Sequence, residues 1–216
     1  MSNMREELLG HYESKKAGIK GRLVEFKKVR NAGDERIFTE LCFCICTPQS
    51  RAVLAWAAMD KLSSTRLLFT GSVEQISAHL RQVRFGEKKA AYIVEARKKF
   101  TVNSKIRIKE FIQEFMKTNS AQELREWIDD NVKGIGMKEA SHFLRNIGFR
   151  GLAILDSHIL ENLKEFDVIN EVPKSMTRRQ YLEIEEKMKE FSQKIGIPFD
   201  ELDLTLWSKE TGFVFK

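Results

Sequence analysis

The sequence contains little of the two residues that most often interrupt helices. It has three prolines and twelve glycines among 216 residues, fewer than the average usage of about 5% and about 7%. Few helix breakers favour long helices over the short strands and frequent turns of a β-sandwich. With 42% hydrophobic residues, the chain can bury a substantial core, which excludes a disordered chain and a minimal peptide scaffold. We therefore predict an all-α protein.

Cysteines are also few, and their positions exclude several kinds of site. Cys42, Cys44 and Cys46 alternate within one apolar run, LCFCICT. An odd number of closely spaced cysteines does not suit a disulfide framework, and the paired C-x-x-C spacing of zinc sites and iron–sulfur loops is missing. We predict reduced thiols that are buried as small apolar groups, and no metal site.

Long apolar runs are missing as well. The apolar stretches are short and broken by charges, and the first residues, MSNMREELLG, lack the apolar region of a signal peptide. We expect a soluble, cytoplasmic protein with no membrane partner.

Positive charge is in slight excess and is concentrated in one segment. The net charge is +6, with a pI near 9.2. Between Arg81 and Glu110, ten basic residues oppose three acidic ones, a balance of +7. The ten are Arg81, Arg84, Lys88, Lys89, Arg97, Lys98, Lys99, Lys105, Arg107 and Lys109. This concentration fits attraction to a phosphate backbone, but a solvated helical face would look the same, so charge alone leaves both interpretations open.

Apolar periodicity predicts helices along most of the chain. The spacing over 34–46 predicts a buried helix with Asp34 as its N-cap, and RAVLAWAAMDKL at 51–62 predicts a second helix. The inward positions of that second helix would be Val53, Leu54 and Ala57. Ser72 and Gln75 fit a capping box that opens a helix through Leu80. Further helices are predicted at 87–100, 109–117, 120–130 and 181–195, the last with an apolar stripe of Tyr181, Ile184, Met188, Phe191 and Ile195 and ended by Gly196.

The segment 121–147 has the pattern of a helix-hairpin-helix, with VKGIG at 132–136 between a helix and a second helix that starts near Met137. Gly134 and Gly136 let the backbone turn sharply and approach a ligand closely. The helix that follows adds a partial positive charge at its N-terminus. Such a clamp binds phosphate without reading bases. Gly-x-Gly before a helix is common by itself, but together with the basic segment it favours DNA binding.

Two residues near this hairpin add chemistry. Lys138 falls in the first turn of the second hairpin helix, where the helix dipole disfavours the protonated amine and so favours a neutral nucleophile. Asp156 follows eighteen residues later, at the end of the apolar run Leu152–Leu155. Its carboxylate fits an N-cap for a helix from Ser157, a catalytic group at a cleft, or both.

Four stretches make the sequence resemble a known enzyme family. They are LCFCICT at 41–47, GIGMKEASHFLRNIGF at 134–149, ILDSHIL at 154–160 and ELDLTLW at 201–207. The hairpin, Lys138 and Asp156 resemble the helix-hairpin-helix DNA glycosylases that also have abasic-site lyase activity. Within that superfamily, the four stretches resemble the archaeal-type, second-class 8-oxoguanine DNA glycosylases/AP lyases over nearly the whole chain. The iron–sulfur branches of the superfamily are disfavoured, because no cysteine follows Cys46.

The resemblance implies an organisation of the chain and a set of partners. It implies a helical barrel subdomain at 34–148, which includes the hairpin at 121–147, and a second helical subdomain of 1–33 plus 149–216, with the active site in the cleft between them. The implied partner is double-stranded DNA that contains 8-oxoguanine or abasic sites. We expect a monomer of prokaryotic type that associates with the nucleoid. We expect no cofactor, although the resemblance also suggests a monovalent cation at the hairpin carbonyls.

The resemblance also implies a mechanism. Lys138 would attack C1′ and form a Schiff base, while an ionised Asp156 would stabilise the positive charge at that carbon. β-Elimination would then nick the strand at the abasic site. Gln49, in the turn TPQS, would fill the space of the everted base, and His158 would contact phosphate. An ordinary turn residue and a structural histidine are the alternatives for these two positions.

Recognition of the base is assigned by resemblance too. Lys216, through a terminal carboxylate, would accept the N7 proton that distinguishes 8-oxoguanine from guanine. Three residues would surround the base: Trp207 stacked on it, Asp203 at its Watson–Crick edge and Phe85 on the opposite face. Core packing is the alternative for Trp207 and Phe85. His142, one helical turn after Lys138, would line the pocket.

Other functions remain open at this point. The same chemistry would serve a glycosylase/lyase for another oxidised base, such as a pyrimidine. A non-catalytic helix-hairpin-helix DNA-binding module is a second alternative, which the Lys138 and Asp156 pair disfavours. A basic helical interaction protein that does not touch DNA is a third.

Overall fold

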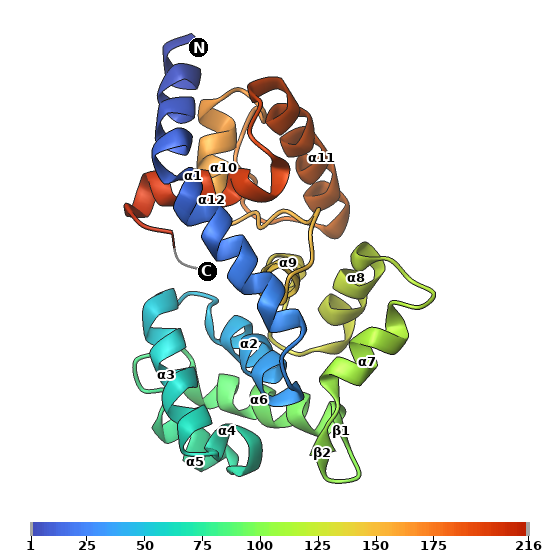
Figure 1. The fold of residues 1–216 in the computed structure, drawn as a ribbon. Helices are drawn as coiled ribbons and strands as arrows, with labels where there is room; N and C mark the ends of the chain where they lie inside the picture. The colour runs from blue at the N-terminus through green and yellow to red at the C-terminus, as the bar shows by residue number, and fades with distance from the viewer. Residues whose placement is uncertain (1, 215–216) are drawn as a thin grey trace. The chain divides into compact units, whose positions relative to one another are not determined.

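The computed structural model describes residues 2–214, and the chain divides into two compact units. We call Met1–Lys27 with Gly148–Lys216 the terminal unit, and Lys28–Ile147 the central unit. Both units are helical, as Figure 1 shows, so the predicted all-α class is confirmed. The sequence-based subdomain bounds, 34–148 against the remainder, stay a prediction. Among the described residues, no helix combines the length and the apolar character needed to cross a bilayer.

The central unit is built around one buried helix, α2. Its elements are α2 (Asp34–Cys46), α3 (Ala52–Ser64), α4 (Leu67–Thr70), α5 (Val73–Ala78), α6 (Gly86–Lys99), β1 (Thr101–Val102), β2 (Lys105–Ile106), α7 (Ile108–Phe115), α8 (Ala121–Asn131) and α9 (Met137–Asn146). Helix α2 packs against α3, α6, α7 and α9, and ten of its thirteen residues are buried. The predicted helix over 34–46 is therefore confirmed.

The three cysteines lie on this buried helix and are free thiols, as predicted. Burial raises the pKa of Cys46 to about 12 and that of Cys42 well above its usual value. Both thiols are therefore protonated at neutral pH and pack as small apolar groups.

The sequence-based assignment of Asp34 as the N-cap of α2 is wrong. Gly33 occupies that position, while Asp34 Oδ1 accepts a hydrogen bond from the backbone N–H of Lys109 at 2.8 Å, near the start of α7. The inward face predicted for α3 is also wrong. Val53 is 49% exposed, Ala57 is exposed and Leu54 only half-buried. The buried positions are Ala55, Met59 and Leu62. This alanine-rich helix carries two apolar stripes at helical spacing, so periodicity did not select one of them.

Shorter elements were predicted less completely. The capping box of Ser72 and Gln75 is confirmed, but its helix ends at Ala78 rather than Leu80. The hairpin of β1 and β2 was missed. Asn103 and Ser104 form its two-residue turn and both have positive φ, 48° and 61°, as a type I′ turn requires. Strands of two residues are too short to show an alternating pattern.

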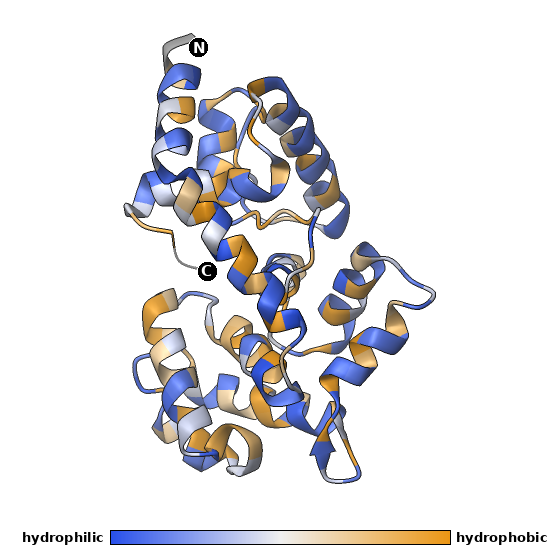
Figure 2. Cartoon of the chain, viewed as in Figure 1, coloured by the Kyte–Doolittle hydropathy of each residue, from blue (hydrophilic) through white to orange (hydrophobic). Residues whose placement is uncertain are grey.

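The terminal unit packs around α12. It contains most of α1 (Ser2–Arg30), together with α10 (Ser157–Glu165), α11 (Arg178–Ile195) and α12 (Phe199–Thr211). Helix α12 packs against both α10 and α11. The apolar stripe predicted on α11 is buried, and Gly196 ends that helix with φ +75°, so both predictions are confirmed. Figure 2 shows polar and apolar residues intermixed along the helices, as expected of helices that bury one face.

A buried segment, 152–155, leads into α10 and belongs to no helix or strand. Two side chains of α11, one helical turn apart, bind its backbone. Tyr181 Oη donates to the Ala153 carbonyl at 2.7 Å and accepts from the Leu155 N–H at 3.2 Å. Glu185 Oε1 accepts from the Ala153 N–H at 2.6 Å. Because buried backbone groups need partners, this brace fixes the segment that ends at Asp156.

Tyr181→Phe tests the brace. The substitution keeps the ring but removes the hydroxyl from two buried backbone groups, so we expect the free energy of unfolding to fall by about 1–3 kcal/mol. The measurement is urea unfolding followed by circular dichroism. Tyr92→Phe is the matched control, since in the described part of the chain the Tyr92 hydroxyl has no hydrogen-bond partner. An equal loss in both variants would contradict the brace.

Candidate active site

The predicted hairpin is formed by α8, residues 132–136 and α9. Gly134 has φ +82°, and a Cβ at this position would overlap the ring of Tyr92, so only glycine fits. Gly136 is the N-cap of α9 with an ordinary φ of −108°, and it has no side-chain cap. Because the N-cap is a glycine, it supplies no side chain to the first N–H groups of α9, and a helix N-terminus of this kind is suited to bind phosphate.

Lys138 is the second residue of α9, as predicted, and its side chain is 33% exposed. Its Nζ lies 2.8 Å from Oε1 of Glu139. Glu139 was not identified from the sequence, although an acidic residue in a first helical turn is itself a favourable signal. The amine is thus partly exposed and forms an ion pair with a carboxylate.

His142 lies one turn after Lys138 on α9 and is buried. Its ring contacts the ring of Phe43 on α2 edge-on, with centroids 5.4 Å apart and an interplanar angle of 77°. The structure thus shows a packing role for His142, and its place in a substrate pocket stays a prediction.

Gln49 and Phe85 lie on two exposed turns of the central unit. Both have left-handed backbone conformations, with φ 55° and 59°. Phe85 is the N-cap of α6 and is 55% exposed, which excludes core packing for it. The Arg84 guanidinium lies over its ring, 4.9 Å from the centroid. Left-handed residues other than glycine are uncommon and cluster at functional sites.

Three of the ten basic residues in the segment 81–110 bind the protein's own backbone. The buried Lys89 Nζ donates to the carbonyls of Cys46 and Pro48, at 2.9 and 2.6 Å, and to Ser50 Oγ at 3.2 Å. Arg97 donates to the carbonyls of Leu68 and Gly71, and Lys109 donates to those of Asn31 and Ala32. The other seven are exposed: Arg81, Arg84, Lys88, Lys98, Lys99, Lys105 and Arg107. The charge available to DNA is therefore smaller than the sequence count suggested.

Asp156 lies in the terminal unit as the N-cap of α10. Its Oδ1 accepts from the Ile159 N–H at 2.9 Å, which confirms the capping role. Within residues 2–214, Oδ2 has no hydrogen-bond partner. One oxygen of the half-buried carboxylate thus anchors it, and the other stays available for chemistry. His158, in the first turn of α10, is exposed.

Asp203 and Trp207 lie one turn apart on α12, also in the terminal unit, so they share a helix face. Asp203 is buried. Trp207 is half-buried and contacts Phe213 edge-on, with ring centroids 5.4 Å apart. Lys216 lies outside the described residues.

The predicted site residues thus fall into two groups, one in each unit. The central unit brings together the turns of Gln49 and Phe85 through Lys89, and it holds the hairpin with Lys138 and His142. The terminal unit holds Asp156, His158, Asp203 and Trp207.

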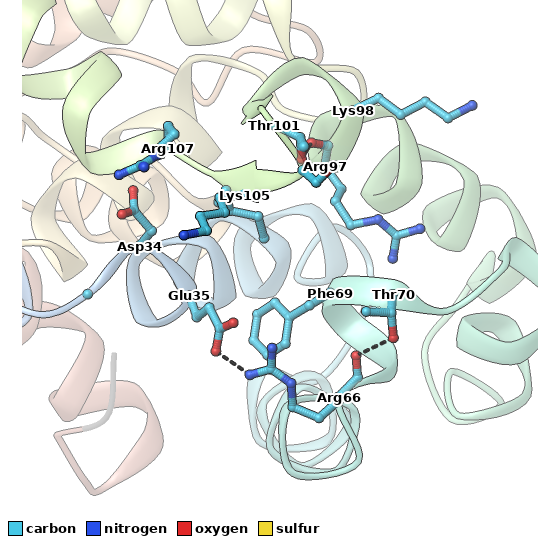
Figure 3. Close-up of a pocket in the computed structure, with 13 residues that line it drawn as sticks. Asp34, Glu35, Arg66, Phe69, Thr70, Arg97, Lys98, Thr101, Lys105 and Arg107 are labelled. Carbon is cyan, nitrogen blue, oxygen red and sulfur yellow. Dashed lines mark hydrogen bonds and ion pairs between the residues drawn. The ribbon is translucent and has the colours of Figure 1, made fainter.

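A pocket with a volume of about 1060 Å³ lies elsewhere in the central unit (Figure 3). It is lined by Asp34 and Glu35 at the start of α2, and by basic residues that include Arg66, Lys105 and Arg107. None of the predicted site residues lines it. The start of α2 is roughly 18 Å from its end at Cys46, at about 1.5 Å per residue, so this pocket is separate from the Gln49 turn. Across the described residues, no cluster of three or more His, Cys, Asp or Glu side chains is arranged to hold a metal ion.

Comparisons with known proteins identify relatives of this chain. The sequence model of a family described as 8-oxoguanine DNA glycosylase matches residues 19–197. An 8-oxoguanine DNA glycosylase/AP lyase from Fusobacterium nucleatum is 46% identical over 207 residues, which cover 95% of this chain and 94% of the relative. One from Methanocaldococcus jannaschii is 39% identical over 200 residues, covering 92% and 91%.

Solved structures give the same result. The chain is similar to the M. jannaschii 8-oxoguanine glycosylase/lyase in complex with a 15mer DNA containing 8-oxoguanine, with a TM-score of 0.87, 35% identity and 99% of each chain covered. It is also similar to the Thermotoga maritima 8-oxoguanine DNA glycosylase, with a TM-score of 0.87, 33% identity and 100% of each chain covered. The chain belongs to the 8-oxoguanine DNA glycosylase family.

Proposed function

We propose that the protein excises 8-oxoguanine from double-stranded DNA and then cleaves the abasic site, as a DNA glycosylase and AP lyase. The observation that carries this proposal is the position of Lys138. Its accessible amine lies in the first turn of the helix that follows the glycine-containing hairpin. A lysine so placed reaches the sugar of a nucleotide whose phosphate is bound at the hairpin.

Excision breaks the bond between C1′ and the base, and positive charge builds at C1′ as that bond lengthens. The ionised Asp156, anchored through Oδ1, stabilises this charge with Oδ2. Before it attacks, the Lys138 ammonium must lose a proton, and Glu139, at 2.8 Å, is the carboxylate in contact with it. The neutral Nζ then forms a bond to C1′ as the base departs.

Strand cleavage follows from the covalent intermediate. Opening of the sugar gives a Schiff base between Lys138 Nζ and C1′, which acidifies the proton on C2′. Transfer of that proton to water expels the 3′ phosphate by β-elimination, and water later hydrolyses the Schiff base to release the enzyme. The covalent bonds of these steps are made by the Lys138 amine and by water, so we propose a reaction without a cofactor.

The remaining site residues are assigned to DNA and base recognition. We propose that Gln49 fills the space of the everted base and that His158 binds phosphate, which its exposure permits. Trp207, Phe85 and the buried Asp203 contact the everted base. Two more residues complete the proposed pocket, Lys216 and His142. We further propose that the protein acts as a cytoplasmic, nucleoid-associated monomer.

Lys138→Gln tests the nucleophile. Without the amine no Schiff base forms, so excision of 8-oxoguanine and abasic-site cleavage should both fall by about 10³-fold or more. The measurements are single-turnover kinetics and borohydride trapping on an 8-oxoguanine duplex. Lys133→Gln is the matched control, since Lys133 lies in the hairpin and pairs with Glu95. Trapping by Lys138→Gln at the wild-type level would refute the mechanism. If the wild type excised an oxidised pyrimidine faster than 8-oxoguanine, the proposed substrate would be wrong.

Two substitutions of Asp156 separate its capping role from its chemical role. Asparagine caps a helix as well as aspartate does, whereas alanine loses the cap at a cost of about 1 kcal/mol. We therefore expect Asp156→Asn to keep the wild-type free energy of unfolding and Asp156→Ala to lower it by about 1 kcal/mol. Both should lower the excision rate by about 10²-fold, because both remove the charge. Urea unfolding and single-turnover kinetics measure the two effects. Full excision by Asp156→Asn would show that Asp156 is only a cap.

A further inference from the structure

We propose that Lys89 is a positioning residue for base eversion, because its side chain and backbone hold the turns of Gln49 and Phe85 in one fixed arrangement. The inference rests on the proposed function, since it assumes that these two turns meet the DNA at the lesion. Lys89 itself is buried and does not reach substrate.

The ammonium of Lys89 is fully engaged with the turn that carries Gln49. An ammonium has three hydrogens to donate, and its three acceptors here are the carbonyls of Cys46 and Pro48 and the hydroxyl of Ser50. Pro48 and Ser50 flank Gln49 on either side. The Gln49 backbone is therefore fixed at both neighbours by one charge.

The same residue is bonded to the second turn. The Lys89 N–H donates to the carbonyl of Phe85 at 3.0 Å, as the first helical bond of α6. Ser50 Oγ, which accepts from Lys89, also accepts from the backbone N–H of Arg84 at 3.0 Å. One ammonium and one hydroxyl thus join two turns that are far apart in the sequence.

Both turns have a backbone that needs such support. Gln49 and Phe85 are held at positive φ, although neither is glycine. Their side chains are exposed, so their own packing does not explain the conformation. Strained conformations of this kind persist where the surroundings over-determine them.

Capping the C-terminal end of α2 does not require a buried ammonium. An uncharged C-cap would satisfy the Cys46 carbonyl without the desolvation that burying a charge costs. Burial lowers the pKa of Lys89, while the nearby Glu139 carboxylate acts to raise it. Capping α2 alone therefore does not account for a charge at this position.

Lys89→Met is the first test, because it keeps the length of the side chain and removes all three hydrogen bonds. Two rates are measured on the same duplex: excision of 8-oxoguanine, which needs an everted base, and cleavage of a preformed abasic site, which has no base to evert. We expect excision to fall at least tenfold and abasic-site cleavage to change less than threefold. Equal losses in the two rates would overturn the inference.

Non-additivity with Gln49 is the second test. If Lys89 acts through Gln49, the double variant Lys89→Met/Gln49→Ala should excise 8-oxoguanine no more slowly than the slower single variant. Multiplied losses would overturn the inference.

Ser50→Ala is the third test, because it removes the hydroxyl that links the two turns while leaving Lys89 two acceptors. We expect Ser50→Ala to show the same selective loss of excision. This test remains valid if Lys89→Met folds poorly. Excision by Ser50→Ala at the wild-type rate would overturn the inference.

Arg97→Met is the matched control. Arg97 is on the same helix and also donates to two backbone carbonyls, those of Leu68 and Gly71, at 3.2 and 2.7 Å. Arg97→Met should lower the free energy of unfolding without changing the ratio of the excision rate to the abasic-site cleavage rate. If this ratio changed, instability alone would explain the effect of Lys89→Met. Failure of the proposed function is distinguishable, because the wild type would then excise no 8-oxoguanine.

Discussion

The unpaired backbone groups at helix ends are the constraint on which this structure depends. Each helix leaves N–H groups at its start and carbonyls at its end that need partners, and here those partners place the site. Asp156 caps α10 and by that contact presents its second oxygen. Lys89 binds the last carbonyl of α2 and by that contact holds the Gln49 turn. The start of α9, whose N-cap is a glycine, is the phosphate site that we propose, with Lys138 in its first turn.

Features that depend on neighbours in the sequence could be predicted. The cap at Asp156, the start of α9 and the buried stripe of α11 each need only a few adjacent residues to be recognised, and all three were found. Features that depend on distant partners could not. The partner of Asp34 is 75 residues away, and that of Lys89 at Cys46 is 43 residues away. No local pattern shows which helix end a side chain will reach.

The basic segment illustrates the same difference for charge. Counting residues identified an excess between Arg81 and Glu110, but three of those cations bind backbone carbonyls and are unavailable to a ligand. We propose that the exposed ones supply salt-sensitive attraction to DNA. The hairpin amides, which carry no net charge, would fix the phosphate in position. In this proposal attraction, positioning and chemistry are carried by different groups, and Lys138 is the lysine that serves the chemistry.

The central claim is that the Lys138 amine forms the covalent bond to DNA. The most direct measurement is peptide mapping by mass spectrometry of the borohydride-trapped adduct between the wild-type protein and an 8-oxoguanine duplex. We predict that the sugar remnant is found on Lys138. A remnant on Lys133, on Lys89 or on any other lysine would contradict it, whatever the rates of the variants.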